Sequence, residues 1–147
     1  MSYMFESCSK VTDLDLGGID VSKVANMAYM FNNCSNLQSI NFTGWNTESL
    51  TNMSYMFQNC KAFDVLDLSN IDISKVTTIS YLLNNFTCNS LILDGWDFSP
   101  VTSNTSWLSG QTAKNVSLKN VKVKGSFTCP YASESINLTG IDTTACT

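Results

Sequence analysis

The apolar residues of this chain recur at a fixed spacing along its N-terminal two thirds. They follow one another at intervals of three, three, three and two residues, and each set lies 26 residues after the previous one. The three sets are Phe5, Cys8, Val11, Leu14 and Leu16, then Phe31, Cys34, Leu37, Ile40 and Phe42, then Phe57, Cys60, Phe63, Leu66 and Leu68. A period of this length predicts a solenoid, in which each coil buries its apolar side against the next.

The repeat continues in a weaker form towards the C-terminus. The period shortens to 25 residues, and only the short strand signatures at residues 91–93, 116–118 and 136–138 remain clear. Each strand is followed by a turn with Gly or Asn, residue types that tolerate a positive φ. We therefore expect one solenoid domain over residues 1–147 with about six coils, regular over 1–100 and degenerate over 101–147.

The segments between the strands carry a helical spacing. Val24, Met27 and Phe31 stand at i, i+3 and i+7, which places side chains on one face of an α-helix. Serines that can cap the free N–H groups of a helix precede such segments, at Ser22, Ser74 and Ser99. Aspartates that suit the positive end of a helix dipole precede them too, at Asp20, Asp72, Asp97 and Asp142. The spacing predicts one short helix in each coil.

Together these patterns predict an α/β repeat solenoid, a right-handed, leucine-rich-repeat-like stack with one narrow parallel sheet and short helices opposite. Strands of successive coils would pair about 4.8 Å apart, so that Leu14 points inward and Asp15 outward. Equivalent outward positions would form one column, which we take as the candidate partner-binding surface: Asp15, Asn41, Asp67, Ile92, Ser117 and Asn137. A calcium ladder along its carboxylates is the alternative to a solvated face.

Two stretches of the third coil resemble the repeat of a known family. Residues 53–60 read Met-Ser-Tyr-Met-Phe-Gln-Asn-Cys, and residues 66–69 read Leu-Asp-Leu-Ser. They are similar to the BspA-type leucine-rich-repeat surface proteins, whose units combine a Met-Phe-x-x-Cys-x-x-Leu stretch with Leu-Asp-Leu-Ser. The resemblance covers residues 1 to about 100. It implies an extracellular or cell-surface location, a role in adhesion or protein contact, and no catalytic residue.

The charge pattern narrows the choice of function. All eight basic residues are Lys, His is absent and the net charge is −4. Such a chain would repel a nucleic-acid backbone, and it lacks the commonest general base and zinc ligand. No apolar run reaches the roughly 20 residues of a membrane-spanning helix. We expect no enzyme, no cofactor, no metal site, no nucleic-acid partner and no direct membrane insertion.

Six cysteines and several Asn-x-Ser/Thr sequons suggest modifications. Cys8, Cys34 and Cys60 occupy equivalent places, and we interpret them as buried thiols, with disulfides as the alternative. A disulfide between Cys129 and Cys146 would hold the degenerate coils together. Candidate glycosylation sites, which depend on secretion by a eukaryote, are Asn41, Asn137, Asn52, Asn85, Asn104 and Asn115, with Asn33 as a further sequon.

The positions of the large side chains and the sequence at the chain ends lead to two further predictions. The Met residues at 27, 30, 53 and 56 fit a core stripe, and Trp45, Trp96 and Trp107 fit anchors at coil corners and not a sugar-stacking platform. The chain opens with the same five residues that stand at 53–57. Either it is a piece of a longer array, or copies stack head to tail into a fibre. The leading hypothesis is a structural and interaction protein whose partners are further copies of the chain or other surface proteins. The alternative is an adhesin that binds a host or neighbouring-cell protein through the outward strand face.

Overall fold

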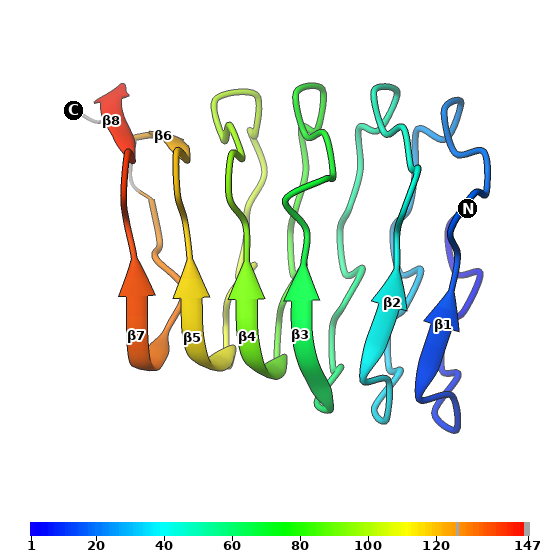
Figure 1. The fold of residues 1–147 in the computed structure, drawn as a ribbon. Helices are drawn as coiled ribbons and strands as arrows, with labels where there is room; N and C mark the ends of the chain where they lie inside the picture. Colours follow the sequence, from blue (N-terminus) through cyan, green and yellow to red (C-terminus); the bar gives the residue numbers. More distant parts are fainter. Residues whose placement is uncertain (126, 146–147) are drawn as a thin grey trace.

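The computed structural model describes residues 1–125 and 127–145 and shows a β-solenoid whose coils stand side by side (Figure 1). Its elements are β1 (Asp13–Asp15), β2 (Ser39–Asn41), β3 (Phe63–Asp67), β4 (Thr87–Ile92), β5 (Thr112–Ser117), β6 (Lys122–Lys124), β7 (Ala132–Asn137) and β8 (Asp142–Ala145). All pairings between these strands are parallel. The prediction of a repeat solenoid with parallel strands is confirmed.

The strands form a central sheet and two smaller ones. The central sheet has the order β3-β4-β5-β7, while β1 pairs with β2 and β6 with β8 in separate two-stranded sheets. Unbroken strand stacking therefore extends over about four turns, and the predicted count of six equivalent coils is not supported. The predicted register is correct: Leu14 pairs with Ile40, and Leu66 lies in line with Leu91 and Val116.

The prediction of one short helix in each coil is wrong, because none of the described residues is helical. The segments between strands are chains of tight turns in which two residues per coil, four positions apart, have φ between 49° and 69°. These pairs are Tyr3 and Ser7, Tyr29 and Asn33, Tyr55 and Asn59, Tyr81 and Asn85, and Ser106 and Gly110. A left-handed residue every fourth position interrupts the right-handed helical backbone. The chain is therefore not α/β in class.

Hydrogen bonds explain why turns replace helices. Within a coil the Met30 N–H donates to the Met27 carbonyl at 3.2 Å, while the Tyr29 N–H donates to the next coil, at the Ser54 carbonyl 3.0 Å away. A helix would use these donors internally and leave neighbouring coils unlinked. The aspartates expected at helix starts close Asx turns instead; the Asp20 carboxylate, for example, accepts the Ser22 N–H at 2.9 Å.

The core runs along the whole stack. The methionines at 27, 30, 53 and 56 are almost fully buried, which confirms their assignment to the core. Trp45 and Trp96 are also buried, and each indole N–H donates to a main-chain carbonyl of the preceding coil, of Leu16 and Leu68, at 2.9 Å. Trp107 is buried as well, but it lies in the turns of residues 105–110, so the prediction of corner anchors is confirmed for Trp45 and Trp96 only.

Candidate functional site

The structure brings the six predicted partner-binding residues into one row across the strands. Asp15 pairs with Asn41 in the first sheet, and the central sheet aligns Asp67, Ile92, Ser117 and Asn137. Asp15, Asn41, Asp67 and Asn137 are exposed, while Ile92 and Ser117 are partly buried. The predicted alignment is confirmed within each of the two sheets, and the partner-binding role of these residues stays a prediction.

Polar side chains of this row form hydrogen bonds within the chain. The Asp15 carboxylate accepts the Gly17 N–H at 3.0 Å and the Asn41 side-chain amide at 2.9 Å. Asp67 and Asn137 close Asx turns onto the N–H groups of the residues two positions further on. These side chains fix the corners after their strands.

Neighbouring rows of the same face are cross-linked in a similar way. The Asn89 amide donates to the Asp64 carboxylate at 2.6 Å, and the Ser39 hydroxyl donates to the Asp13 carboxylate at 2.5 Å. The Ser39 bond holds the pKa of the Asp13 carboxyl below its usual value. Val65 interrupts this polar face, with 46% of its side chain exposed. We call the exposed residues of β1 to β5 and β7 the strand face.

A second set of repeated contacts lies on the turn segments and was not predicted. The rings of Tyr3, Tyr29, Tyr55 and Tyr81 stack in one ladder with centroids 4.4–4.7 Å apart. Beside it, the side-chain amides of Asn85, Asn59 and Asn33 are linked in sequence by bonds of 2.7 Å. The recurrence of Tyr and Asn at 26-residue intervals was visible in the sequence and could have revealed both ladders.

The candidate glycosylation sites differ in how free their amide nitrogens are. The Asn41 amide donates to Asp15, and the Asn85 amide donates to Asn59. Asn52 and Asn115 are partly buried, whereas Asn104 and Asn137 are exposed. Glycosylation stays a prediction, for which Asn104 and Asn137 offer the most accessible nitrogens.

The described cysteines are thiols. Cys34 and Cys60 are fully buried, and each S–H donates to a carbonyl of the preceding coil, of Phe5 and Phe31. Burial raises the pKa of Cys34 to about 11 and that of Cys88 to about 12, so both are protonated and inert near neutral pH. In the predicted disulfide between Cys129 and Cys146, Cys146 lies outside the described residues.

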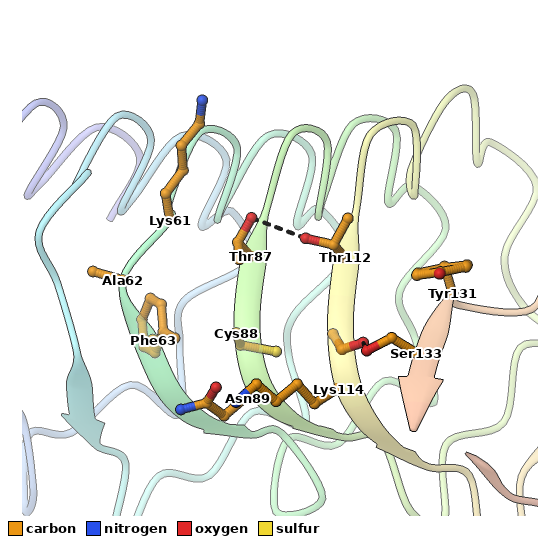
Figure 2. Close-up of a pocket in the computed structure, with 11 residues that line it drawn as sticks. Lys61, Ala62, Phe63, Thr87, Cys88, Asn89, Thr112, Lys114, Tyr131 and Ser133 are labelled. Carbon is orange, nitrogen blue, oxygen red and sulfur yellow. Dashed lines mark hydrogen bonds between the residues drawn. The ribbon is translucent and has the colours of Figure 1, made fainter. Parts of the chain in front are cut away.

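A groove opens over the central sheet where buried side chains become small. Its volume is about 380 Å³, and the lining residues shown in Figure 2 lie on β3, β4, β5 and β7 and directly before β3 and β7. Its walls include Phe63, Cys88 and Ala113, which are aligned by the strand register. Leu37 stands 26 residues before Phe63 in the same pattern. The aligned side chains therefore shrink along the stack from Leu and Phe to Cys and Ala.

Polar groups edge this groove, which we call the β4–β5 groove. The hydroxyls of Thr87 and Thr112 lie 3.1 Å apart and form a hydrogen bond (Figure 2). Tyr131 is 60% exposed, and its main chain is clamped by the buried Gln111, whose amide accepts the Tyr131 N–H at 2.8 Å and donates to the Tyr131 carbonyl at 3.2 Å. Lys114 also lines the groove. No sequence motif pointed to this site.

Other kinds of site receive less support from the described residues. Within residues 1–125 and 127–145, no three His, Cys, Asp or Glu side chains converge closely enough to hold a metal ion. The same residues contain no helix with the length and apolarity needed to cross a bilayer. The expected absence of an enzyme activity, a cofactor and a metal stays a prediction.

Comparison with known proteins corrects the family resemblance. A family model described as "Mycoplasma protein of unknown function, DUF285" matches residues 1–121. No curated protein and no solved structure matches the chain. The resemblance to BspA-type leucine-rich-repeat proteins was therefore wrong, since the matching model is that of a different family. The location and role which that resemblance implied must be supported by other observations.

Proposed function

We propose that this chain, which belongs to the DUF285 family, is a non-enzymatic structural and interaction protein at the cell surface or outside the cell. Its working surface is the strand face, which contacts another macromolecule. The observation that carries this proposal is the set of lateral bonds on that face, such as those from Asn41 to Asp15 and from Asn89 to Asp64. Polar groups already fixed in place lose little conformational entropy when a partner binds.

The centre of the strand face also offers an apolar contact. Val65 is exposed close to Asp64 and Asp67, so a single apolar side chain stands among polar and charged ones. This combination of a small apolar centre and a polar rim is typical of protein interfaces. It favours a protein partner over a purely electrostatic one.

The proposed contact can be tested on Val65. Fluorescently labelled chain would be added to intact cells of the source organism and to cultured host cells, and bound fluorescence measured. We expect Val65→Lys to reduce binding several-fold, because a long charged side chain would stand in the contact. The matched change Ala25→Lys, at an exposed position on a turn segment, should leave binding unchanged. Equal effects of the two variants would contradict a role for the strand face.

Association of the chain with itself is the second candidate function. The coil-to-coil ladders favour it, because rings and amides that stack between coils of one chain can stack between coils of two chains. Sedimentation velocity over a wide range of protein concentrations would test this. Elongated species that grow with concentration would support fibre formation, whereas a single slow monomer at every concentration would oppose it.

The proposed location has a separate test. Intact cells treated with a protease that cannot enter them should lose this chain, as detected with an antibody, while a cytoplasmic marker survives. The sparse charge of the chain, 14% of residues, with abundant Asn, Ser and Thr, is the compositional support for an exposed location. Full protection of the chain in intact cells would contradict it.

A further inference from the structure

We propose that the β4–β5 groove binds a hexuronate, a six-carbon sugar acid. The groove lies within the strand face, since Thr87, Thr112 and Lys114 are exposed residues of β4 and β5, and the inference goes beyond the macromolecular contact because it concerns a hollow of small-molecule size. Its volume of about 380 Å³ lies at the lower end of the range of roughly 300–1,000 Å³ that is usual for ligand pockets. The hollow results from the small side chains of Cys88 and Ala113, where an earlier coil has Leu37.

The strands below the groove exclude a peptide that would add to the sheet. β4 pairs with β3 on one side and with β5 on the other, so the sheet offers no free edge at this place. Peptides that bind by strand addition need such an edge. Recognition in the groove therefore relies on side chains, which suits a small polar molecule.

The polar lining matches the hydroxyl groups of a sugar. Thr87, Thr112 and Ser133 each place a hydroxyl at the groove, and the Ser133 hydroxyl, which donates to the Ala113 carbonyl, can still accept a hydrogen bond. The Asn89 amide donates one hydrogen to Asp64, which leaves its second hydrogen and its oxygen for a ligand. All four side chains lie on neighbouring strands of one rigid sheet, so their spacing is fixed before a ligand arrives. Such preorganisation lowers the entropic cost of binding.

Tyr131 supplies an apolar surface at the end of the groove. The residue is 60% exposed, while the two bonds to the amide of Gln111 fix its main chain. Gln111 itself is 4% exposed, so a buried polar residue positions an exposed aromatic one. A tyrosine combines an apolar ring face with a polar tip, which suits a sugar ring with apolar C–H groups and polar substituents.

The positive charge of Lys114 favours a ligand that carries a carboxylate. Among the described residues, no carboxylate lies within the 4.0 Å of an ion pair with the Lys114 ammonium group. Asp64 is on β3, two strands away, and Glu134 is on the neighbouring strand β7. Figure 2 shows Lys61 at the upper rim with its ammonium group pointing away from the other labelled residues. One cation in the groove fits one carboxylate, and its three N–H donors can also bind ring or hydroxyl oxygens.

The test compares a sugar acid with its neutral counterpart. The full chain, labelled with ¹⁵N, would be titrated with glucuronate and with glucose while amide chemical shifts are followed. We expect shifts that saturate around Thr87, Thr112 and Tyr131, with glucuronate bound about tenfold more tightly than glucose, since one charge-assisted contact is worth roughly that factor. Lys114→Met should abolish this preference, whereas Lys75→Met, at an exposed lysine outside the groove, should preserve it.

A second variant separates loss of the site from loss of the fold. Ala113→Leu restores the bulk that Leu37 provides in an earlier coil, so the chain should keep its circular dichroism spectrum and lose glucuronate binding. Tyr131→Phe should bind within about twofold of the original chain, and Tyr131→Ala at least fivefold more weakly, if the ring face makes the contact. Absence of saturable shifts up to tens of millimolar glucuronate would overturn the proposal. Tighter binding of an acidic tetrapeptide with the same dependence on Lys114 and Ala113 would also overturn it.

Discussion

The coils up to β3 and the coils from β4 onward solve the same packing problem with different side chains. Around β2 and β3 the aligned positions hold Leu37 and Phe63, both buried, and the ring of Phe57 stacks on Phe31 with centroids 5.3 Å apart. Around β4 and β5 the equivalent positions hold Cys88 and Ala113, and a groove opens there. The strand register is regular from β3 to β5, and it shifts between Ala113 and Asn115 where β5 pairs with β7.

The difference shows what a β-solenoid needs and what it tolerates. Strand pairing from β3 to β5 persists even though the aligned side chains shrink from Phe63 to Cys88 and Ala113. Bulk at aligned positions fills the space between coils, and its loss leaves an accessible hollow instead of a collapsed coil. We therefore assign the stability of the chain mainly to the earlier coils and its capacity for small ligands to the later ones.

The largest test of this comparison removes an aromatic ring from each region. Phe57 is fully buried, so Phe57→Ala should cost about 3–5 kcal/mol of unfolding free energy. Phe127 is only partly buried beside Phe98 and Trp107, and Phe127→Ala should cost about 1–2 kcal/mol. Urea unfolding of both variants measures the difference. Equal costs would show that the two regions contribute alike.

The next test exchanges side-chain bulk at aligned positions. Leu37→Ala should destabilise the chain by about 2–4 kcal/mol, because it opens a cavity in a closely packed coil. Ala113→Leu should change stability by about 1 kcal/mol or less, since the added side chain enters an existing hollow. Urea unfolding measures both variants. A large loss of unfolding free energy in Ala113→Leu would mean that rigid neighbouring residues, and not the small side chain at position 113, shape the groove.

The repeat pattern of the sequence was sufficient to predict the stacking but not the backbone between the strands. Equal spacing of Leu14, Ile40 and Leu66 correctly placed them in register. The i, i+3, i+7 spacing of Val24, Met27 and Phe31 also fits consecutive tight turns, which bury every third or fourth side chain. The pairs four residues apart, such as Tyr29 and Asn33, mark the positions where a positive φ replaces the backbone of a helix.

The candidate sites show the same limit. The outward row from Asp15 to Asn137 followed from strand alternation, so its members could be named in advance. The β4–β5 groove depends on the sizes of aligned side chains and on the clamp between Gln111 and Tyr131. These residues are 20 positions apart and carry no motif, so nothing in the linear pattern joined them.

The reactivity of the cysteines also distinguishes the well-packed coils from the C-terminal part of the chain. Burial raises the pKa of Cys34 to about 11 and of Cys88 to about 12, whereas Cys129 is exposed. At pH 8 an alkylating reagent should modify Cys129 at least tenfold faster than either buried thiol, as measured by peptide mass spectrometry. Modification of Cys129 only after reduction would instead support its predicted disulfide with Cys146.

The same thiols predict a loss of stability in alkali. An unfolded cysteine ionises near pH 9, whereas Cys34 and Cys88 stay protonated in the folded chain up to about pH 11 and 12. Below pH 9 the stabilisation is complete, and it falls as the pH rises from 9 through the folded values, because the unfolded chain then binds fewer protons. Urea midpoints measured from pH 8 to 11 should decrease, and Cys34→Ala should reduce that slope. A slope unchanged by this substitution would contradict the assignment.

The smallest effect tests whether an earlier ladder can be extended into the later coils. Gly110 occupies the place of Asn85 in the next coil, with a similar φ of 69° and no atom closer than 3.5 Å to an added Cβ. Gly110→Asn should stabilise the chain by about 0.5–1 kcal/mol, because the new amide can donate to Asn85 and because asparagine tolerates this φ. Gly110→Ala lacks the amide and should destabilise the chain by about 1 kcal/mol, since alanine is strained at a positive φ. If both variants lower the midpoint of urea unfolding equally, the asparagine ladder adds no stability beyond its backbone geometry.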